Sequence, residues 1–190
     1  LLSKTGSGKS SLLKTIYGDL TLTQGLGEVA GFKLHQLKRK EIPYLRRKLG
    51  IVFQDFQLLS DRSVFENMRF VMKATGWTDE VKIKMRVKEL LAKVGLESKE
   101  MVMPFQLSGG EQQRISIARA LINDPEIILA DEPTGNLDPE TSEEIMKILL
   151  DISKTGRCIL FATHDLLLYS KFPARTLMCD NNKIADSVKL

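Results

Sequence analysis

The chain has 190 residues, of which 43% are hydrophobic and 27% charged, so it is long enough for one domain with a core of its own. No apolar run approaches the roughly 20 residues of a membrane-spanning helix, and no apolar stretch follows the first lysines, so we expect neither a membrane span nor a signal peptide. The net charge is +4, with small basic clusters at residues 38–40 and 46–48. Nucleic acid or an anionic membrane surface could use these clusters, but no aromatic residues interleave with them, which favours a solvated face over nucleic-acid binding.

Cys158 and Cys179 have a spacing that fits neither a metal site nor a redox motif. Both cysteines lie in apolar stretches of the sequence. We therefore expect two buried thiols in a protein of a reducing compartment.

Helical and extended patterns alternate along the chain, which is typical of an α/β fold. Near the N-terminus, the sequence predicts a helix over residues 9–17 that ends at Gly18. Short strands are predicted over residues 27–32 and 50–54.

Helices are predicted over residues 63–75 and 79–94. Residues 81–88 also alternate with the period of a strand, but apolar residues continue at helical spacing up to Gly95, which suits a helix C-cap. The whole block 63–123 is therefore interpreted as a helical subdomain within one domain that spans the chain.

The last third of the chain returns to the alternating pattern. Residues 127–130 predict a buried strand, residues 139–154 a helix, and residues 157–163 a second strand. A short helix is expected from about Asp165, and a terminal hairpin that turns at residues 181–182.

Residues 3–10 form a phosphate-binding loop of the type G-x-x-x-x-G-K-[ST], with Ser3 in place of its first glycine. The remaining glycines allow the backbone to approach phosphate oxygens closely, at the N-terminus of a helix that favours anions. Lys9 is expected to reach the β- and γ-phosphates, and Ser10 to ligate Mg²⁺. The alternative, a glycine-serine loop that opens a helix by chance, fits the intact second half of the motif poorly.

Asp131 and Glu132 follow directly on the apolar strand 127–130. At that strand end, Asp131 is placed to hold Mg²⁺ through its water shell, and Glu132 to polarise an attacking water molecule. Alone the pattern is weak, because helix starts often carry acidic residues. Downstream of a phosphate-binding loop it predicts a nucleotide hydrolase.

Two further polar residues end predicted strands. Gln54 lies between the phosphate-binding loop and the helical block, which makes it a candidate sensor of γ-phosphate and Mg²⁺. His164 follows the strand 157–163. Alone, each would be an ordinary surface residue, and only the order of the motifs makes them candidates.

Residues 107–114 read Leu-Ser-Gly-Gly-Glu-Gln-Gln-Arg, and this segment resembles the signature sequence of the ATP-binding-cassette (ABC) ATPases. The order of the motifs also resembles that family across nearly the whole chain: phosphate-binding loop, Gln54, signature, Asp131-Glu132, Asn136-Leu137-Asp138 and His164. The resemblance implies a P-loop NTPase fold with a RecA-like core and a helical subdomain, and an enzyme that hydrolyses ATP to ADP and phosphate.

The resemblance also implies a head-to-tail homodimer that holds two ATP molecules between its subunits. Each ATP would lie between the phosphate-binding loop of one subunit and Ser108, Gly109 and Gly110 of the other, and residues 136–138 would cross the dimer interface. The implied catalytic residues are Glu132, His164, Gln54 and Lys9; the implied metal ligands are Ser10, Gln54 and Asp131; and the implied nucleotide-binding set is Ser3, Lys4, Thr5, Gly6, Ser7, Gly8, Lys9, Ser10, Ser11, Ser108, Gly109, Gly110 and Asp138.

Within the family, residues 17–20, 46–62 and 130–138 are most similar to the FtsE group of cell-division ATPases. That likeness implies a four-span membrane partner of the FtsX type, a location on the cytoplasmic face of the bacterial inner membrane, and a role in cell-wall hydrolysis. The partner's docking groove would involve residues 54–59 and the start of the helical block. Phe56, Leu58 and Leu59 would be exposed apolar surface there, or else ordinary core. A lipoprotein, peptide or macrolide exporter is the main alternative, because such ATPases share residues 130–138.

Family members usually carry several dozen residues before the phosphate-binding loop, including strands and an aromatic residue that stacks on adenine. This chain begins two residues before the loop, so we expect the N-terminal β-subdomain to be largely missing. An ABC protein that acts on DNA is disfavoured, because the stretch between Gln54 and Ser108 is too short for a long coiled coil.

Overall fold

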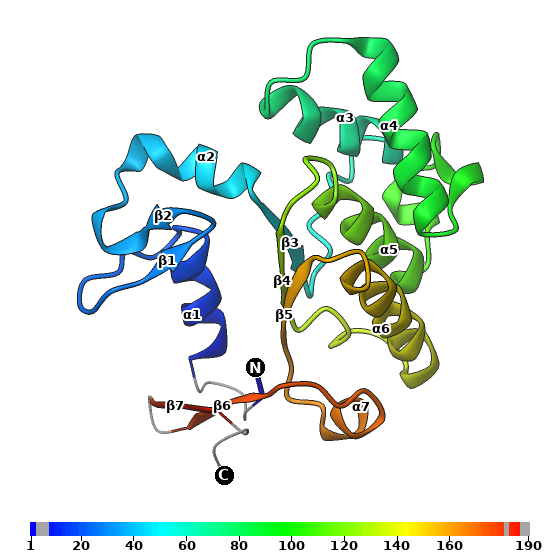
Figure 1. Ribbon diagram of the computed structural model, residues 1–190. Coiled ribbons are helices and arrows are strands. Elements are labelled where there is room, and N and C mark those ends of the chain that lie inside the picture. The colour runs from blue at the N-terminus through cyan, green and yellow to red at the C-terminus, as the bar shows by residue number, and fades with distance from the viewer. Residues whose placement is uncertain (3–7, 181–182, 187–190) are drawn as a thin grey trace.

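Three parallel strands form the centre of the computed structural model, which describes residues 1–2, 8–180 and 183–186 (Figure 1). They are β3 (Leu49–Phe53), β4 (Ile127–Asp131) and β5 (Cys158–Ala162), in the order β3-β4-β5. The three strands predicted at these places are confirmed to within one or two residues at each end. Leu2 adds single parallel bridges to Thr163 and Met178 beside β5.

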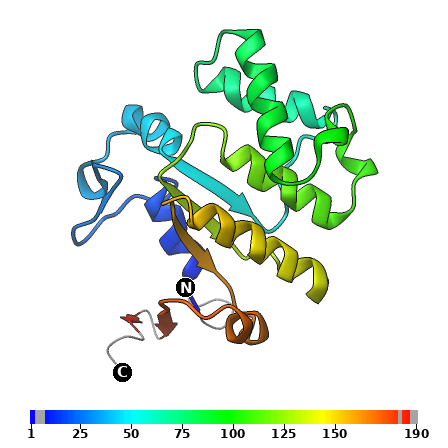
Figure 2. The ribbon, with the colours of Figure 1, turned by 45° about the vertical axis from the view of Figure 1, so that its right-hand side comes forward.

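Helices cover both faces of this sheet. α1 (Lys9–Ile16) lies on one side, and α5 (Gly109–Ala120) and α6 (Pro139–Ser153) lie on the other, as Figures 1 and 2 both show. β4 is apolar as far as Ala130 because it is buried on both faces: Ile128 and Ala130 belong to the core under α5 and α6, and Leu129 to the core under α1. In the described part of the chain, no helix is both long and apolar enough to span a bilayer.

The predicted helical block contains α3 (Val64–Ala74) and α4 (Glu80–Lys93), both as expected. Each begins at a capping side chain: Ser63 Oγ accepts from the N–H of Glu66 at 3.3 Å, and Asp79 Oδ1 accepts from that of Val81 at 2.9 Å. Burial on α4 follows helical spacing, with Ile83, Val87, Leu90 and Leu91 inside. These helices share one core with α5, β3, β4 and α6, so their separation as a subdomain stays a prediction.

The C-terminal elements also follow the prediction. Asp138 caps α6, and Asp165 caps α7 (Leu166–Lys171) by accepting from the N–H groups of Leu167 and Leu168. β6 (Leu177–Asp180) pairs antiparallel with β7 (Lys183–Asp186), as a terminal hairpin requires. The predicted turn, residues 181–182, lies outside the described residues.

One strand prediction is wrong. Residues 27–32 do not form one strand but most of a small antiparallel hairpin of β1 (Glu28–Val29) and β2 (Phe32–Lys33). Ala30 and Gly31 between them have φ of 48° and 83°, the positive values that a tight two-residue hairpin turn requires. The turn signal was hidden because alanine rarely adopts this conformation.

Several short helical segments were not predicted. α2 (Ile42–Arg47) begins with a proline near its first position, which is a helix-start signal that the charged sequence around it obscured. In the described part of the chain, 3₁₀ turns connect the longer elements at Leu34–Gln36, Arg39–Glu41, Glu97–Lys99 and Pro104–Gln106.

The prediction for the cysteines is half wrong. Cys179 is buried, but Cys158 is exposed. Cys158 is the first residue of β5, at the rim of the sheet, and burial increases along the strand: Ile159, Leu160 and Phe161 are half-buried and Ala162 is buried.

Gly50 lies where β3 passes close to the end of α5. A Cβ atom there would lie 2.7 Å from the carbonyl oxygen of Ala120 and 3.2 Å from Cγ of Pro125. Neither neighbour is the end of a flexible side chain, so we expect Gly50→Ala to lower the free energy of unfolding by about 1–3 kcal/mol, measured by urea denaturation. Gly27→Ala is the control, because its Cβ would meet only ordinary contacts of 3.4 Å or more. Equal midpoints for the two variants would contradict the prediction.

Candidate functional site

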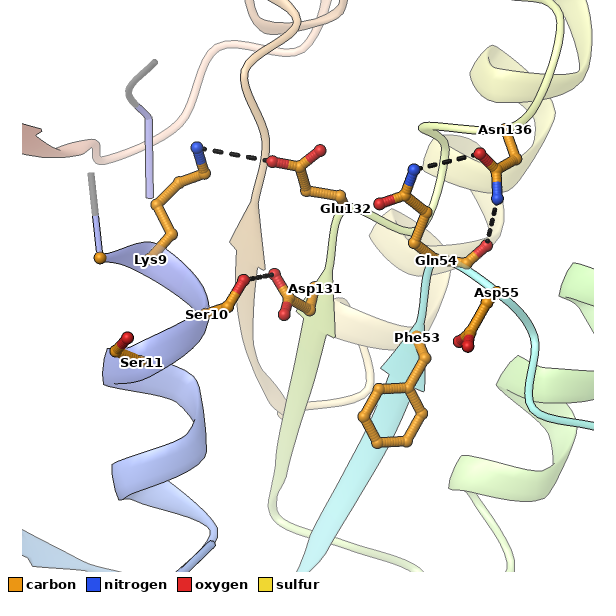
Figure 3. Close-up of a pocket in the computed structure, with 10 residues that line it drawn as sticks. Lys9, Ser10, Ser11, Phe53, Gln54, Asp55, Asp131, Glu132 and Asn136 are labelled. Carbon is orange, nitrogen blue, oxygen red and sulfur yellow. Dashed lines mark hydrogen bonds and ion pairs between the residues drawn. The ribbon is translucent and has the colours of Figure 1, made fainter. Parts of the chain in front are cut away.

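A cavity of ≈ 680 Å³ opens at the carboxyl ends of β3 and β4, beside the N-terminus of α1 (Figure 3). In open parallel sheets, ligands bind at this edge of the strands. The cavity brings together residues that are far apart in the sequence: Gly8, Lys9, Ser10, Ser11, Phe53, Gln54, Asp55, Asp131, Glu132 and Asn136.

The N-terminus of α1 forms one wall of the cavity. Gly8 precedes the helix with φ of 95°, a left-handed conformation that glycine adopts without strain, and it has no side chain to cap the helix. The first turn therefore presents N–H donors and the positive end of the helix dipole, which together suit a phosphate group. Lys9 opens the helix and is only 4% exposed.

Glu132 lies between two basic side chains. Its Oε1 is 3.5 Å from Lys9 Nζ, and its Oε2 is 2.8 Å from His164 Nδ1. The carboxylate side chain is 17% exposed, whereas His164 is 49% exposed and lies toward solvent. The three side chains come from α1, from the end of β4 and from the end of β5, so the fold places one carboxylate between a lysine and a histidine.

Ser10 and Asp131 form a second pair across the cavity. The Ser10 hydroxyl donates to Asp131 Oδ1 at 3.2 Å. Mg²⁺ in nucleotide sites is held by one or two protein oxygens together with phosphate oxygens, and a hydroxyl beside a carboxylate provides such oxygens. Among the described residues, no group of three or more His, Cys, Asp or Glu side chains could hold a metal ion. The residues present therefore fit a magnesium ion shared with a nucleotide.

The backbone at Glu132 is strained. Its φ is 47°, although it is not glycine and precedes Pro133, a position that normally favours extended backbone. Two hydrogen bonds hold the conformation: its N–H donates to Ala162 O at 2.9 Å, and its carbonyl accepts from the N–H of Gly135 at 3.0 Å. Strain of this kind persists where the surrounding structure fixes it, and it often marks a functional position.

Gln54 is fixed by Asn136 through two hydrogen bonds (Figure 3). Gln54 Nε2 donates to Asn136 Oδ1 at 3.1 Å, and Asn136 Nδ2 donates to the Gln54 carbonyl at 3.2 Å. The amide oxygen of Gln54 consequently turns away from Asn136 (Figure 3). Gly135 makes room for this arrangement, because a Cβ there would lie 2.8 Å from Gln54 Nε2.

Sequence reasoning missed Asn136, Asp55 and Phe53 as cavity residues. The family resemblance implies for Asn136 only a place in the loop that crosses the dimer interface. The one signal for its role is its place four residues after Glu132, in the loop that leaves the end of β4. Nothing in the sequence pairs it with Gln54.

The signature residues do not line this cavity. Ser108 caps α5 through a reciprocal pair: its Oγ accepts from the N–H of Glu111 at 3.2 Å, and Glu111 Oε2 accepts from the N–H of Ser108 at 2.8 Å. Gly110 packs against Thr141, whose Cγ2 would lie 2.5 Å from an added Cβ. Asp138 likewise caps a helix, and its hydrogen bonds from Thr141 lower the pKa of its carboxyl.

The predicted site residues thus fall into three groups. Lys9, Ser10, Ser11, Gln54, Asp131, Glu132 and His164 come together at or beside the cavity, and Gly8 lines it. Ser108, Gly109, Gly110 and Asp138 lie elsewhere in the same chain. Ser3, Lys4, Thr5, Gly6 and Ser7 lie outside the described residues.

Comparisons with known proteins show the family to which the chain belongs. Residues 1–135 match the model of the ABC transporter family. The cell division ATP-binding protein FtsE of Bacillus subtilis is 44% identical over 184 residues, which are 97% of this chain and 80% of that protein. FtsE of Streptococcus pneumoniae is 43% identical with the same coverage, and FtsE of Escherichia coli is 42% identical over 99% of this chain and 84% of its own.

Solved structures give the same result. A dimeric post-hydrolysis state of the ATP-binding cassette MJ0796, bound to ADP and Pi, superposes with a TM-score of 0.85 at 33% identity, covering 98% of this chain and 82% of that one. The cassette cbiO1 of Clostridium perfringens, part of the transporter complex cbiONQ, gives 0.86 at 32% identity, covering 97% and 73%. The fold is that of a P-loop ABC ATPase. A family model covers most of the chain's length, and an acid, a lysine and a serine gather at the N-terminus of α1: the chain belongs to the ABC transporter family of ATPases.

Proposed function

We propose that this chain is the ATP-hydrolysing subunit of a bacterial ABC complex of cell division, which acts on a membrane partner of the FtsX type to regulate cell-wall hydrolysis. The observation that carries the proposal is the identity of 42–44% to FtsE proteins over nearly the whole chain, in bacteria as different as Escherichia coli and Bacillus subtilis.

The cavity supports ATP hydrolysis by charge neutralisation and positioning, which phosphoryl transfer chiefly requires. Lys9 and the N-terminus of α1 would bind the phosphates of ATP. Glu132 would orient and polarise the attacking water, and His164, 2.8 Å from its carboxylate, would hold that side chain in place. Mg²⁺ held by Ser10 and Asp131, with Gln54 nearby, would neutralise charge on the phosphates.

A second copy of the chain would complete the site. The signature residues Ser108, Gly109 and Gly110 form the cap and first turn of α5 and do not line the cavity, so they would contact ATP only across a dimer interface. The cassette MJ0796 was solved as a dimer, which supports this arrangement. We propose a head-to-tail homodimer that closes on two ATP molecules and opens after hydrolysis removes contacts to the γ-phosphate.

A partner could dock beside the segment that follows Gln54. Phe56 and Leu58 are half-buried in that segment, and Leu59 is 36% exposed. A further cavity of ≈ 380 Å³ lies between α2 and α3, and its lining includes Gln57 of this segment together with Arg46, Arg47 and Arg119. We propose that a cytoplasmic helix of the membrane partner occupies this region and holds the subunit at the inner face of the membrane.

The test is recovery of partners from native membranes in mild detergent, with the parent protein and two leucine variants. Leu59→Glu alters the proposed docking segment, whereas Leu150→Glu alters a leucine of similar exposure, 39%, on α6. We expect the parent and Leu150→Glu to recover an integral membrane protein with division-site or cell-wall-hydrolase proteins, and Leu59→Glu to recover much less. Recovery of a lipoprotein or peptide export component would instead make the chain an exporter subunit.

A further inference from the structure

The chain turns sharply just after Gln54, at two residues with left-handed backbone. Phe56 has φ of 59° and Gln57 of 48°, and the N–H of Gln57 donates to Asp55 O at 2.6 Å. Residues with a Cβ atom are crowded in this conformation. Two such residues in succession therefore need contacts from another segment to hold their backbone in place.

Arg119, near the end of α5, supplies that restraint. Its Nη2 donates to the carbonyl of Phe56 at 2.8 Å, and its Nη1 donates to the carbonyl of Gln57. A planar guanidinium can serve two adjacent acceptors at once, which an ammonium group cannot do in the same fixed geometry. Burial lowers the pKa of Arg119, and the nearby Asp55 carboxylate acts against that shift, so the group stays charged at neutral pH.

The same helix holds the chain on the other side of Gln54 as well. Gln113 is fully buried, and its Nε2 donates to the carbonyl of Phe53 at 3.2 Å. The ring of Phe56 reaches the first turn of α5, where its Cζ lies 3.7 Å from the position of a Cβ on Gly109. Gln54 is therefore flanked by two backbone segments that are both attached to the helix beginning with the signature.

We propose that Arg119 is a positioning residue for ATP hydrolysis, which fixes the turn after Gln54 to α5 and so ties Gln54 to the signature helix. Arg119 does not line the ATP cavity, and it acts only through the turn. When α5 moves, Ser108–Gly110 at its start are displaced. The backbone on either side of Gln54 moves with them, because the same helix holds it. This role of Arg119 does not depend on which membrane partner the chain has. It rests on the ATPase activity and on the place of Gln54 in the cavity.

Arg119→Lys tests the proposal, because lysine keeps the charge but loses the fork that spans both carbonyls. We expect kcat for ATP to fall on the order of tenfold to a hundredfold, as for a displaced reacting geometry, and KM to change less than about twofold. Arg86→Lys is the matched control: Arg86 also donates to two backbone carbonyls at the end of α5, Leu121 O at 2.8 Å and Ile122 O at 3.4 Å. Its kcat should match the parent's.

Gln57→Gly, added to Arg119→Lys, separates positioning from folding. Glycine adopts a φ of 48° without crowding, and the Gln57 side chain is exposed, so the turn needs less restraint and kcat should recover several-fold. Three results would overturn the proposal. The Arg119→Lys protein could have the parental kcat, its KM could change together with its kcat, or kcat could fail to recover when Gln57→Gly is added. If Arg119→Lys does not fold, Gln57→Val strains the same turn with Arg119 intact. It should lower kcat alone, and an unchanged kcat would equally overturn it.

Discussion

Replacing Glu132 by glutamine is expected to reduce ATP turnover by about 10²- to 10⁴-fold, the range that a positioned general base supplies. Glutamine has the size of glutamate, so the strained backbone at φ 47° and the bonds to Ala162 and Gly135 need not change. What is lost is the negative charge between Lys9 and His164, at the place where the attacking water would be polarised.

ATP binding should survive the same substitution. The phosphates of ATP are themselves anions, so removing a carboxylate beside Lys9 does not weaken their attraction to the lysine or to the N-terminus of α1. With binding intact and hydrolysis blocked, the variant should accumulate as an ATP-bound dimer. Turnover is measured by phosphate release, ATP affinity by titration with a fluorescent analogue, and mass by light scattering with ATP.

Glu126→Gln is the matched control for this prediction. Glu126 immediately precedes β4 at the opposite end from Glu132, and its carboxylate makes a surface ion pair with Lys48 at 3.3 Å. The chemical change is identical, but the side chain is 66% exposed and far from the cavity along the strand, so turnover should be that of the parent. A Glu132→Gln protein that hydrolyses ATP at near the parental rate would remove Glu132 as the base.

The sequence predicts those parts of the molecule that follow from local pattern. The apolar run 127–130 must be a strand buried on both faces, and a parallel strand ends at the same edge as its neighbours, so Gln54, Asp131 and His164 are brought together by topology alone. α4 could be distinguished from a strand because its apolar residues continue at helical spacing over the full 14 residues.

Features that depend on contacts between distant segments could not be predicted. The left-handed backbone at Glu132 and at Phe56–Gln57 runs against the preference of each residue, and hydrogen bonds with distant segments, at Ala162 and Arg119, help to hold it there. Asn136 is an ordinary loop residue until β3 and β4 lie side by side, when its amide meets that of Gln54. Long-range pairs of this kind leave no periodic trace in the sequence.

Ser108→Arg should abolish most ATP turnover while leaving ATP binding to the same chain intact. A long charged side chain at the start of α5 would block the approach of a second copy and place a cation where that copy's ATP must fit. Ser108 does not line the cavity of its own chain, so Lys9 and Ser10 remain available to bind nucleotide. Ser108→Ala removes the capping oxygen, at a cost of about 1 kcal/mol in stability, and with it the hydroxyl that would face the other copy's ATP. It adds neither bulk nor charge, so it should retain more turnover than Ser108→Arg.

Mixing two inactive variants tests whether the site is shared between copies. Lys9→Ala lacks the phosphate-binding lysine but keeps its signature, and Ser108→Arg has the reverse defect. In a two-fold symmetric dimer made of one of each, one site combines the intact lysine of one copy with the intact signature of the other, so an equal mixture should regain up to about a quarter of parental turnover. Each variant alone should show no ATP turnover, even when its protein concentration is raised. The mixture could instead stay as inactive as its components while both variants still bind to the parent chain. The signature would then not act across the interface, and the loss of turnover in Ser108→Arg would need another explanation.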